Sequence, residues 1–193
     1  AVAVAAAIND SSAATGVRAR VGESSTTGGN VAGGQLVTDG NSDNRLIING
    51  ATITGVNVQA GDAGDSLIQS INAVSGDTGV IAERDAAGGV QLTAQDGRNI
   101  EIQTTGDAAA ITGLTDGVTT GTVTLESDAT FDIAGTRPQD AGFAASTVGV
   151  NPDSSIRSVD VTTQESANLS IDVIDRAIES VGRQRSEFGA VQN

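Results

Sequence analysis

The chain has 193 residues, a net charge of −14, no cysteine and no histidine, and all ten of its cations are arginine. This composition excludes disulfides, thiolate metal sites and a cysteine nucleophile, and it disfavours nucleic acid, because binding it draws on clustered cations. No apolar run reaches the roughly 18 residues of a membrane-spanning helix, so we expect no membrane partner.

Two similar segments lie near the start of the chain. Residues 7–19 align with residues 70–82 at an offset of 63, and both contain Ile-Asn followed by Thr-Gly-Val. Each copy predicts a helix that ends at Ile-Asn, a short polar turn, and a strand opened by Thr-Gly-Val. The glycines, Gly16 and Gly79, suit the positive φ that such a turn often needs.

The second copy continues on both sides of this segment. Strands are expected at 45–48 and 51–58 around Asn49-Gly50, a strong two-residue hairpin signal. A helix at 66–74, capped by Asp65-Ser66, follows. Its apolar face comprises Leu67, Ile68, Ile71 and Val74. Further strands are expected at 79–84, 90–94 and 99–104. The pattern predicts a ββ-α-βββ unit, in which one short helix covers one face of an antiparallel sheet.

The region after the second copy has weaker signals. Strands at 121–126 and 130–133 are expected to form a hairpin, with Ser127-Asp128 near its turn. Residues 134–155 contain both prolines and have no clear period, which indicates a loop or linker.

The end of the chain predicts a long amphipathic helix. Thr162 is a candidate cap, with Glu165 three residues later. Apolar residues follow at 4-3 spacing, which is the coiled-coil heptad rule, with Arg185 the one polar residue on the seam. The seam positions are Ala167, Ile171, Ile174, Ile178, Val181, Arg185 and Phe188. A lone helix of this kind is marginal in water, so we expect its partner helices to lie in sequence outside this chain, a fragment of a longer protein.

Residues 171–193 closely resemble the C-terminal core helix of bacterial flagellins. The most specific part is Arg185-Ser186-Glu187-Phe188-Gly189-Ala190-Val191-Gln192-Asn193, which matches that family's pattern of Arg, small, polar, large apolar, then Gly-Ala-hydrophobic-Gln-Asn. Residues 49–102 resemble the flagellin inner repeat through Ile-Asn-Gly, Ser-Ile-Asn and Thr-Gly-Val. Residues 1–21 resemble the back half of a first copy.

The resemblance implies an α+β fold with two parts. A solvent-facing outer domain, antiparallel and β-rich with short covering helices, is expected at 1–155, and one long α-helix of the filament's coiled-coil core at 156–193. Within the outer domain we expect a partial first repeat at 1–44, a second repeat at 45–106, and a β-hairpin and linker at 107–155. The core helices that the family needs for polymerisation are expected to be missing from this fragment.

The function implied by the resemblance is a secreted, extracellular structural subunit of the bacterial flagellum. It would self-assemble with other flagellin subunits and serve motility. Host innate receptors, a flagellar chaperone and the filament cap are further partners implied for the full-length protein. The expected subunit contacts are Ile171, Ile174, Ile178, Val181, Arg185 and Phe188.

Catalysis is disfavoured by the residues themselves. Serine nucleophiles lack the usual His or Lys base, and a carboxylate pair would have no Trp or Tyr to stack on sugar. Residues 39–44 partly match a calcium loop, but Asn44 and Gly50 replace its glycine and its bidentate glutamate, which favours a polar turn. We therefore predict that the protein is not an enzyme and has no catalytic, cofactor-binding or metal-ligating residues.

Two alternatives to a filament subunit stay open. A hook-associated or filament-cap protein shares the inner repeat, although the terminal Gly-Ala-Val-Gln-Asn disfavours it. A secreted β-rich adhesin or binding module would account for the repeats but not for the heptad helix. The Ser/Thr-rich loop at 24–27 is an O-glycan position by family resemblance alone.

Overall fold

A computed structural model describes residues 1–38, 43–127, 129–148 and 159–191. The chain divides into two compact units, Ala1–Leu125 and Glu126–Asn193. Parts of the sequence patterns above lie outside the described residues: most of the calcium-like loop, Asp128 of the predicted turn, Pro152 of the predicted linker, and the final Gln192-Asn193.

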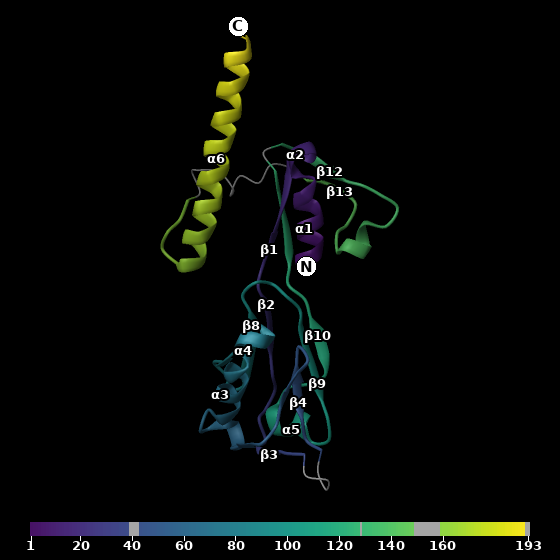
Figure 1. Ribbon diagram of the computed structural model, residues 1–193, viewed down its shortest axis with the longest axis vertical. Helices are drawn as coiled ribbons and strands as arrows, with labels where there is room; N and C mark the ends of the chain where they lie inside the picture. The colour runs from purple at the N-terminus through teal and green to yellow at the C-terminus, as the bar shows by residue number, and fades with distance from the viewer. Residues whose placement is uncertain (39–42, 128, 149–158, 192–193) are drawn as a thin grey trace. The chain divides into compact units, whose positions relative to one another are not determined.

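The elements run in the following order (Figure 1). The helices are α1 (Val2–Asp10), α2 (Ser12–Thr15), α3 (Ser66–Ala73), α4 (Ser75–Thr78), α5 (Ala108–Thr112) and α6 (Gln164–Val191), with 3-10 turns η1 (Ala60–Asp62) and η2 (Pro138–Ala141). The strands are β1 (Val17–Val21), β2 (Ser24–Thr27), β3 (Gly34–Leu36), β4 (Leu46–Ile48), β5 (Ala51–Ile53), β6 (Val56–Val58), β7 (Ile81–Arg84), β8 (Val90–Ala94), β9 (Ile100–Thr104), β10 (Gly117–Thr119), β11 (Val123–Ser127), β12 (Phe131–Ile133) and β13 (Ser146–Val148).

The fold mixes α-helices with antiparallel β-structure, which confirms the predicted class. The strands of the second repeat do not form one sheet, however. β4 and β9 belong to a four-stranded sheet of order β10-β9-β4-β5, whereas β7 and β8 pair with β2 in a three-stranded sheet. The single-sheet prediction was wrong because β2 and β10, from outside residues 45–104, supply partners that the local pattern does not reveal.

The Asn49-Gly50 hairpin is confirmed. Both residues have positive φ, 48° and 85°, as a two-residue turn of the I′ type requires, and Leu46–Ile48 pairs with Ala51–Ile53. The predicted strand at 51–58 is broken at Gly55, whose φ is 75°. Beyond this break the chain leaves the hairpin, and β6 pairs instead with β3.

The two similar segments adopt the same local structure. In both, the helix is followed by one further helical turn, α2 or α4, where a short polar turn was predicted. Gly16 and Gly79 end these turns with the same φ of 69°. In the second copy the threonine before the glycine accepts a hydrogen bond from the backbone N–H of Val80 at 3.1 Å. In the first copy Thr15 accepts the equivalent bond from Val17 at 3.2 Å.

The asparagine of each Ile-Asn pair fastens its helix to the following strand. Asn72 donates through Nδ2 to the carbonyl of Ala82 at 2.9 Å and accepts from the Ala82 N–H at 2.7 Å. Asn9 makes the same two bonds with Ala19, at 2.8 and 2.7 Å. The asparagine amide offers a donor and an acceptor on two separate atoms, which matches the carbonyl and the N–H of one strand residue, and this explains why Ile-Asn marks the repeat.

Replacing Asn72 by Ala is therefore expected to destabilise the protein by about 2 kcal/mol, because it leaves the strand N–H and carbonyl of Ala82 without their partners. Asn72→Asp should also destabilise, since a carboxylate keeps the acceptor and loses the donor. Urea denaturation of both variants measures the effect. A free energy of unfolding unchanged by Asn72→Ala would contradict this role.

The core of the first unit lies between the helices and the two larger sheets. The predicted apolar face of α3 is confirmed, with Leu67 and Ile71 fully buried and Ile68 and Val74 packed against them at the edge. α3 rests on β7 and β6, and α5 rests on β3 and β4. The predicted cap at Asp65-Ser66 was wrong in the residue that accepts the hydrogen bonds, since the Asp65 side chain makes no capping bond. The carboxylate of Asp62, three residues earlier, accepts from the backbone N–H groups of Leu67 and Ile68.

The strands near residues 121–133 exist but do not pair as predicted. β11 pairs with β1, and β12 pairs with β13. The partner strands lie far away in sequence or inside the stretch expected to be a linker, so the local hairpin signal misassigned them. The residues of that stretch that the structure describes contain η2 and β13.

Candidate assembly surface

Helix α6 begins with a reciprocal cap. Thr163 Oγ1 accepts from the backbone N–H of Ser166 at 3.1 Å, and Ser166 Oγ accepts from the N–H of Thr163 at 3.0 Å. This is a capping box with serine at its third position, one residue later than the predicted Thr162–Glu165 pair. The shift has a physical reason: Thr162 donates its N–H to the Asp160 carboxylate and so belongs to the preceding turn.

The hydroxyl of Ser170 ties the first turns of α6 to the segment before it. Ser170 is buried, donates to the carbonyl of Asp160 at 2.8 Å and accepts from the Asp160 N–H at 3.2 Å. These bonds hold the chain that enters the helix against the helix itself. They fix the start of α6 without using its apolar side chains.

Six of the seven seam residues of α6 are exposed, and the seventh, Ala167, is partly buried. Ile171 is 57% exposed, Ile178 is 65% exposed and Phe188 is 70% exposed. Ile174 and Val181 are exposed as well, and Arg185 completes the row. Together these six residues, Ile171, Ile174, Ile178, Val181, Arg185 and Phe188, are called the α6 stripe below.

A shallow, largely apolar groove lies along the middle of the stripe. The small residues Ala177 and Gly182 leave space between the larger side chains. The groove is lined by Ile174, Ala177, Ile178, Val181, Gly182 and Arg185. Small residues beside large ones allow a second helix to approach and insert its side chains, which is how coiled-coil helices pack. Burying one isoleucine of this kind stabilises a contact by roughly 1.5–3 kcal/mol.

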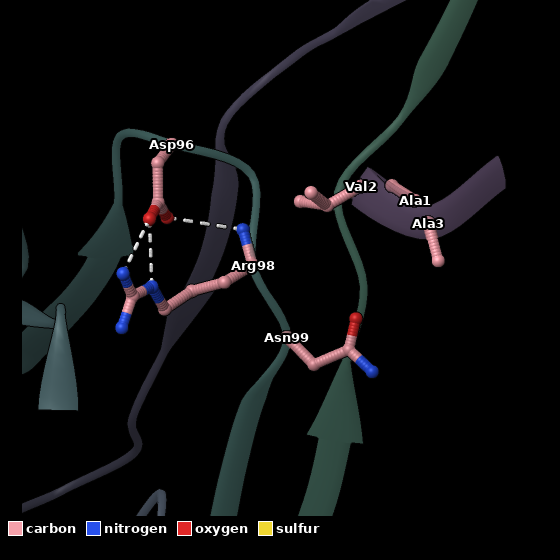
Figure 2. A pocket seen from close by; sticks show the side chains of 6 residues that line it. All are labelled: Ala1, Val2, Ala3, Asp96, Arg98 and Asn99. Carbon is pink, nitrogen blue, oxygen red and sulfur yellow. Dashed lines mark hydrogen bonds and ion pairs between the residues drawn. The ribbon is translucent and has the colours of Figure 1, made fainter. Parts of the chain in front are cut away.

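A second hollow lies in the first unit, between the start of α1 and the β8–β9 turn (Figure 2). Its polar side is an ion pair. Arg98 Nε donates to Asp96 Oδ2 at 2.7 Å, and the Arg98 backbone N–H donates to Oδ1 at 3.1 Å. Ala1, Val2 and Ala3 form its apolar side, with Asn99 completing the lining. An exposed, mutually neutralised pair beside alanine and valine offers no reactive group.

The Asp96–Arg98 pair predicts a pH effect. The hydrogen bond from the Arg98 side chain, with backbone and charge contributions from the same residue, lowers the pKa of Asp96 against a smaller opposing effect of desolvation. Because the folded-state pKa is depressed, the pair's stabilisation is present above the unfolded-state pKa and is lost as pH falls through the folded-state pKa. Arg98→Gln is expected to raise the pKa of Asp96 toward its ordinary value, which NMR titration of the carboxyl carbon measures. An unchanged titration curve would rule the interaction out.

Two further candidate sites of the sequence analysis are the calcium-like loop and the Ser/Thr-rich segment. Within the part of the chain that the structure describes, no group of three or more carboxylates is placed to hold a metal ion. The Ser/Thr-rich segment at 24–27 is strand β2 and not a loop, and Ser24 is buried with its hydroxyl bonded to the Arg98 carbonyl. Only Ser25 and Thr27 of the segment are exposed.

No helix among the described residues is both long enough and apolar enough to cross a membrane.

The sequence of the chain is similar to those of several known proteins. A family model described as the flagellin hook IN motif matches residues 45–96, which is the region of the Asn49-Gly50 hairpin, α3 and the β7–β8 pair. The chain is 34% identical to the B-type flagellin of Pseudomonas aeruginosa over 104 residues, covering 54% of this chain and 21% of that protein. It is 35% identical to flagellin A of Helicobacter mustelae over 97 residues, covering 50% of this chain and 18% of that protein.

A longer match of 27% identity links the chain to flagellin A of Helicobacter pylori, over 96% of this chain and 44% of that protein. The chain thus spans about a fifth of the length of the first two relatives and less than half of the third. Over the matched motif and these aligned segments, the chain is similar to bacterial flagellins.

Proposed function

Starting from the flagellin motif and the flagellin relatives, we propose that this chain is part of a structural subunit of the bacterial flagellar filament, which assembles by packing the α6 stripe against helices of neighbouring copies. The observation that carries the proposal is the exposed row of large apolar side chains at heptad spacing on α6. The match of residues 45–96 to the flagellin hook IN motif supports reading that row as a contact between subunits.

Physical chemistry favours helix partners for the stripe. Exposed apolar residues scattered singly are ordinary, but a continuous row marks an interaction surface. The row follows a 4-3 spacing, so one partner helix that supercoils around α6 can contact all of it. Arg185 is the one charged member. It suits a polar contact on a neighbouring helix that fixes the register of the pair.

The assignment of residue ranges to an outer domain and a core helix follows the resemblance to flagellins. Residues 1–155 form the outer domain, with a partial first repeat at 1–44, a second repeat at 45–106 and a hairpin-and-linker region at 107–155. Residues 156–193 form the core helix, packed in a coiled-coil layer. The outer domain displays a variable surface outside the cell, and the full-length protein serves motility as a non-enzymatic building block. Host innate receptors, a flagellar chaperone and the filament cap are partners of that full-length protein.

The hook-associated, cap and adhesin alternatives are less well supported. The relatives quoted above are flagellins by name. An adhesin built from the repeats would have no use for an exposed heptad row on a long helix. Assembly of the full-length protein distinguishes these possibilities directly.

Ile178→Asp, made in the full-length protein, is expected to abolish polymerisation under conditions in which the unchanged protein forms filaments. The new carboxylate would lie in the middle of the stripe, where burial without a partner is strongly unfavourable. The matched control is Ser180→Asp. At about 100° per residue the control lies about 200° around the helix from Ile178 and adds the same charge off the stripe.

Sedimentation and electron microscopy of both variants measure the outcome. Filaments formed by Ser180→Asp but not by Ile178→Asp support the proposal. Normal filaments from Ile178→Asp would contradict it, as would the absence of filaments from the unchanged full-length protein. Circular dichroism of each variant shows whether the outer domain has kept its fold.

A further inference from the structure

We propose that the apolar surface of α1 is the docking site for an antiparallel β-hairpin with the apolar pattern of residues 46–58, joined to the N-terminal side of α1. In the second repeat, β6 packs on α3, and the buried residues of the hairpin that precedes β6 belong to the same apolar core as α3. The inference rests on the internal repeat. It is independent of the proposed function, because it concerns only what covers the apolar surface of α1.

The two repeats are equivalent residue by residue. Asn9 and Asn72 bind Ala19 and Ala82 through the same two atoms, at distances that agree within 0.1 Å. The equivalence continues at the C-cap. Thr15 donates to the carbonyl four residues before it at 3.0 Å, and Thr78 does so at 3.1 Å. Subtracting 63 from a residue number of the second repeat therefore gives a true structural counterpart in the first.

The counterparts of the most buried residues of α3 are incompletely covered in α1. Leu67 and Ile71 are both 0% exposed, whereas their counterparts Val4 and Ile8 are only partly buried. The reason lies in the neighbours. α3 is held between β7 and β6, while α1 packs mainly on β1, the counterpart of β7. α1 therefore lacks a strand on the side that β6 covers in the second repeat.

The outer positions of α1 extend the apolar surface further. Where α3 has Asp65, Ser66 and Gln69, α1 has Val2, Ala3 and Ala6. These three residues are exposed, Val2 to 46%. A helix that is apolar on all sides is normally buried. In the second repeat Ser66 donates to the Asn57 carbonyl of β6. Alanine at the counterpart position cannot do this, so the expected contact is apolar and a charged or polar partner is disfavoured.

The hollow of Figure 2 leaves room for the connection. It is bounded by Ala1, Val2 and Ala3 at the first turn of α1. In the second repeat the 3-10 turn η1 leads from β6 into the first turn of α3. A hairpin joined ahead of Ala1 would reach α1 by the same short route.

A chimeric chain tests the inference. A copy of residues 45–63 is placed directly ahead of Ala1 in the 193-residue chain, which restores the 63-residue register. The matched control carries the same extension with Leu46→Ser, Ile53→Ser and Val58→Ser in the added copy only. Hydrogen exchange of residues 2–10 is measured in both chains and in the unextended chain.

The apolar extension is expected to slow exchange in α1 by about tenfold or more, because opening the helix must then also break the added contact. Exchange in α3 should stay unchanged, which shows that the original hairpin has not been displaced. Slowing with the apolar extension alone supports the proposal. Equal slowing with both extensions, or none with either, would overturn it.

Discussion

Gly97→Ala is expected to lower the free energy of unfolding by about 3 kcal/mol more than Gly88→Ala does. Both glycines lie in turns between strands and have positive φ, 69° and 85°, so each alanine carries a backbone strain of about 1–2 kcal/mol. At Gly88 the new methyl group meets nothing within 4 Å. At Gly97 it would collide with the Val21 side chain and with the carbonyl oxygen of Gly22.

The collision is costly because backbone surrounds the site. Three backbone segments of the first unit approach one another closely at Gly22, Gly97 and Gly121. A methyl group on Gly121 would lie 2.7 Å from the carbonyl oxygens of both Gly22 and Gly97. Backbone carbonyls cannot rotate aside as a side chain can, so the segments themselves would have to separate, and overpacking of this kind commonly costs 1–3 kcal/mol or more.

Urea denaturation of the Gly97→Ala and Gly88→Ala variants measures the difference. The shared strain cancels when the two are compared, and the steric contribution remains. Unfolding free energies that agree within error would show that the crossing segments have room that the structure does not indicate.

Asp62→Ala is expected to lower the free energy of unfolding by about 3 kcal/mol. The Asp62 side chain is completely buried. Its Oδ1 accepts from the Leu67 N–H at 3.0 Å and its Oδ2 from the Ile68 N–H at 3.1 Å. Hydrogen bonds to a charged group contribute about 1.5–3 kcal/mol each, and the buried donors left behind add a desolvation cost.

Asp65→Ala is the matched control. Asp65 also has positive φ, 53° against 46° for Asp62, so both alanines carry a similar backbone strain. Its carboxylate pairs with Arg84 at 2.6 Å in a partly exposed setting, where an ion pair contributes about 0–1 kcal/mol. Asp62→Asn, which tolerates positive φ and keeps one acceptor, should fall between the two alanine variants.

Equilibrium unfolding in urea, followed by circular dichroism, orders the three variants. The result that would reject the capping role is an Asp62→Ala loss no greater than that of Asp65→Ala. Loss of α3 alone, seen as fast hydrogen exchange at 66–73 with the strands still protected, would instead place the effect within the helix and leave the capping role intact.

Local patterns were sufficient for several elements because the forces involved act over a few residues. The Asn49-Gly50 turn follows from the tolerance of both residues for positive φ. The apolar face of α3 follows from its 3.6-residue period. Gly16 and Gly79 could be placed at helix ends for the same local reason. The heptad spacing of the α6 stripe is likewise a property of the sequence alone.

Other features depend on segments that meet only after folding. Nothing near residues 121–127 indicates that β11 pairs with β1, or that β2 joins the edge of β8. The helix α5 was missed because it is only five residues long. A signal for its end was present in Thr112-Gly113-Leu114, since Thr112 accepts from the Leu114 N–H at 3.2 Å as the repeat threonines do.

Sequence by itself determined the repeat, its helix ends and the composition that disfavours catalysis, because each is set by single residues or by spacing along one element. The tertiary structure decided strand pairing, the choice of Asp62 over Asp65 as the cap of α3, and the crowding at Gly97. Pairing and crowding depend on distances between residues far apart in the chain. The cap depends on the folded backbone that brings the Asp62 carboxylate to the N–H groups of Leu67 and Ile68. No periodic pattern encodes those distances.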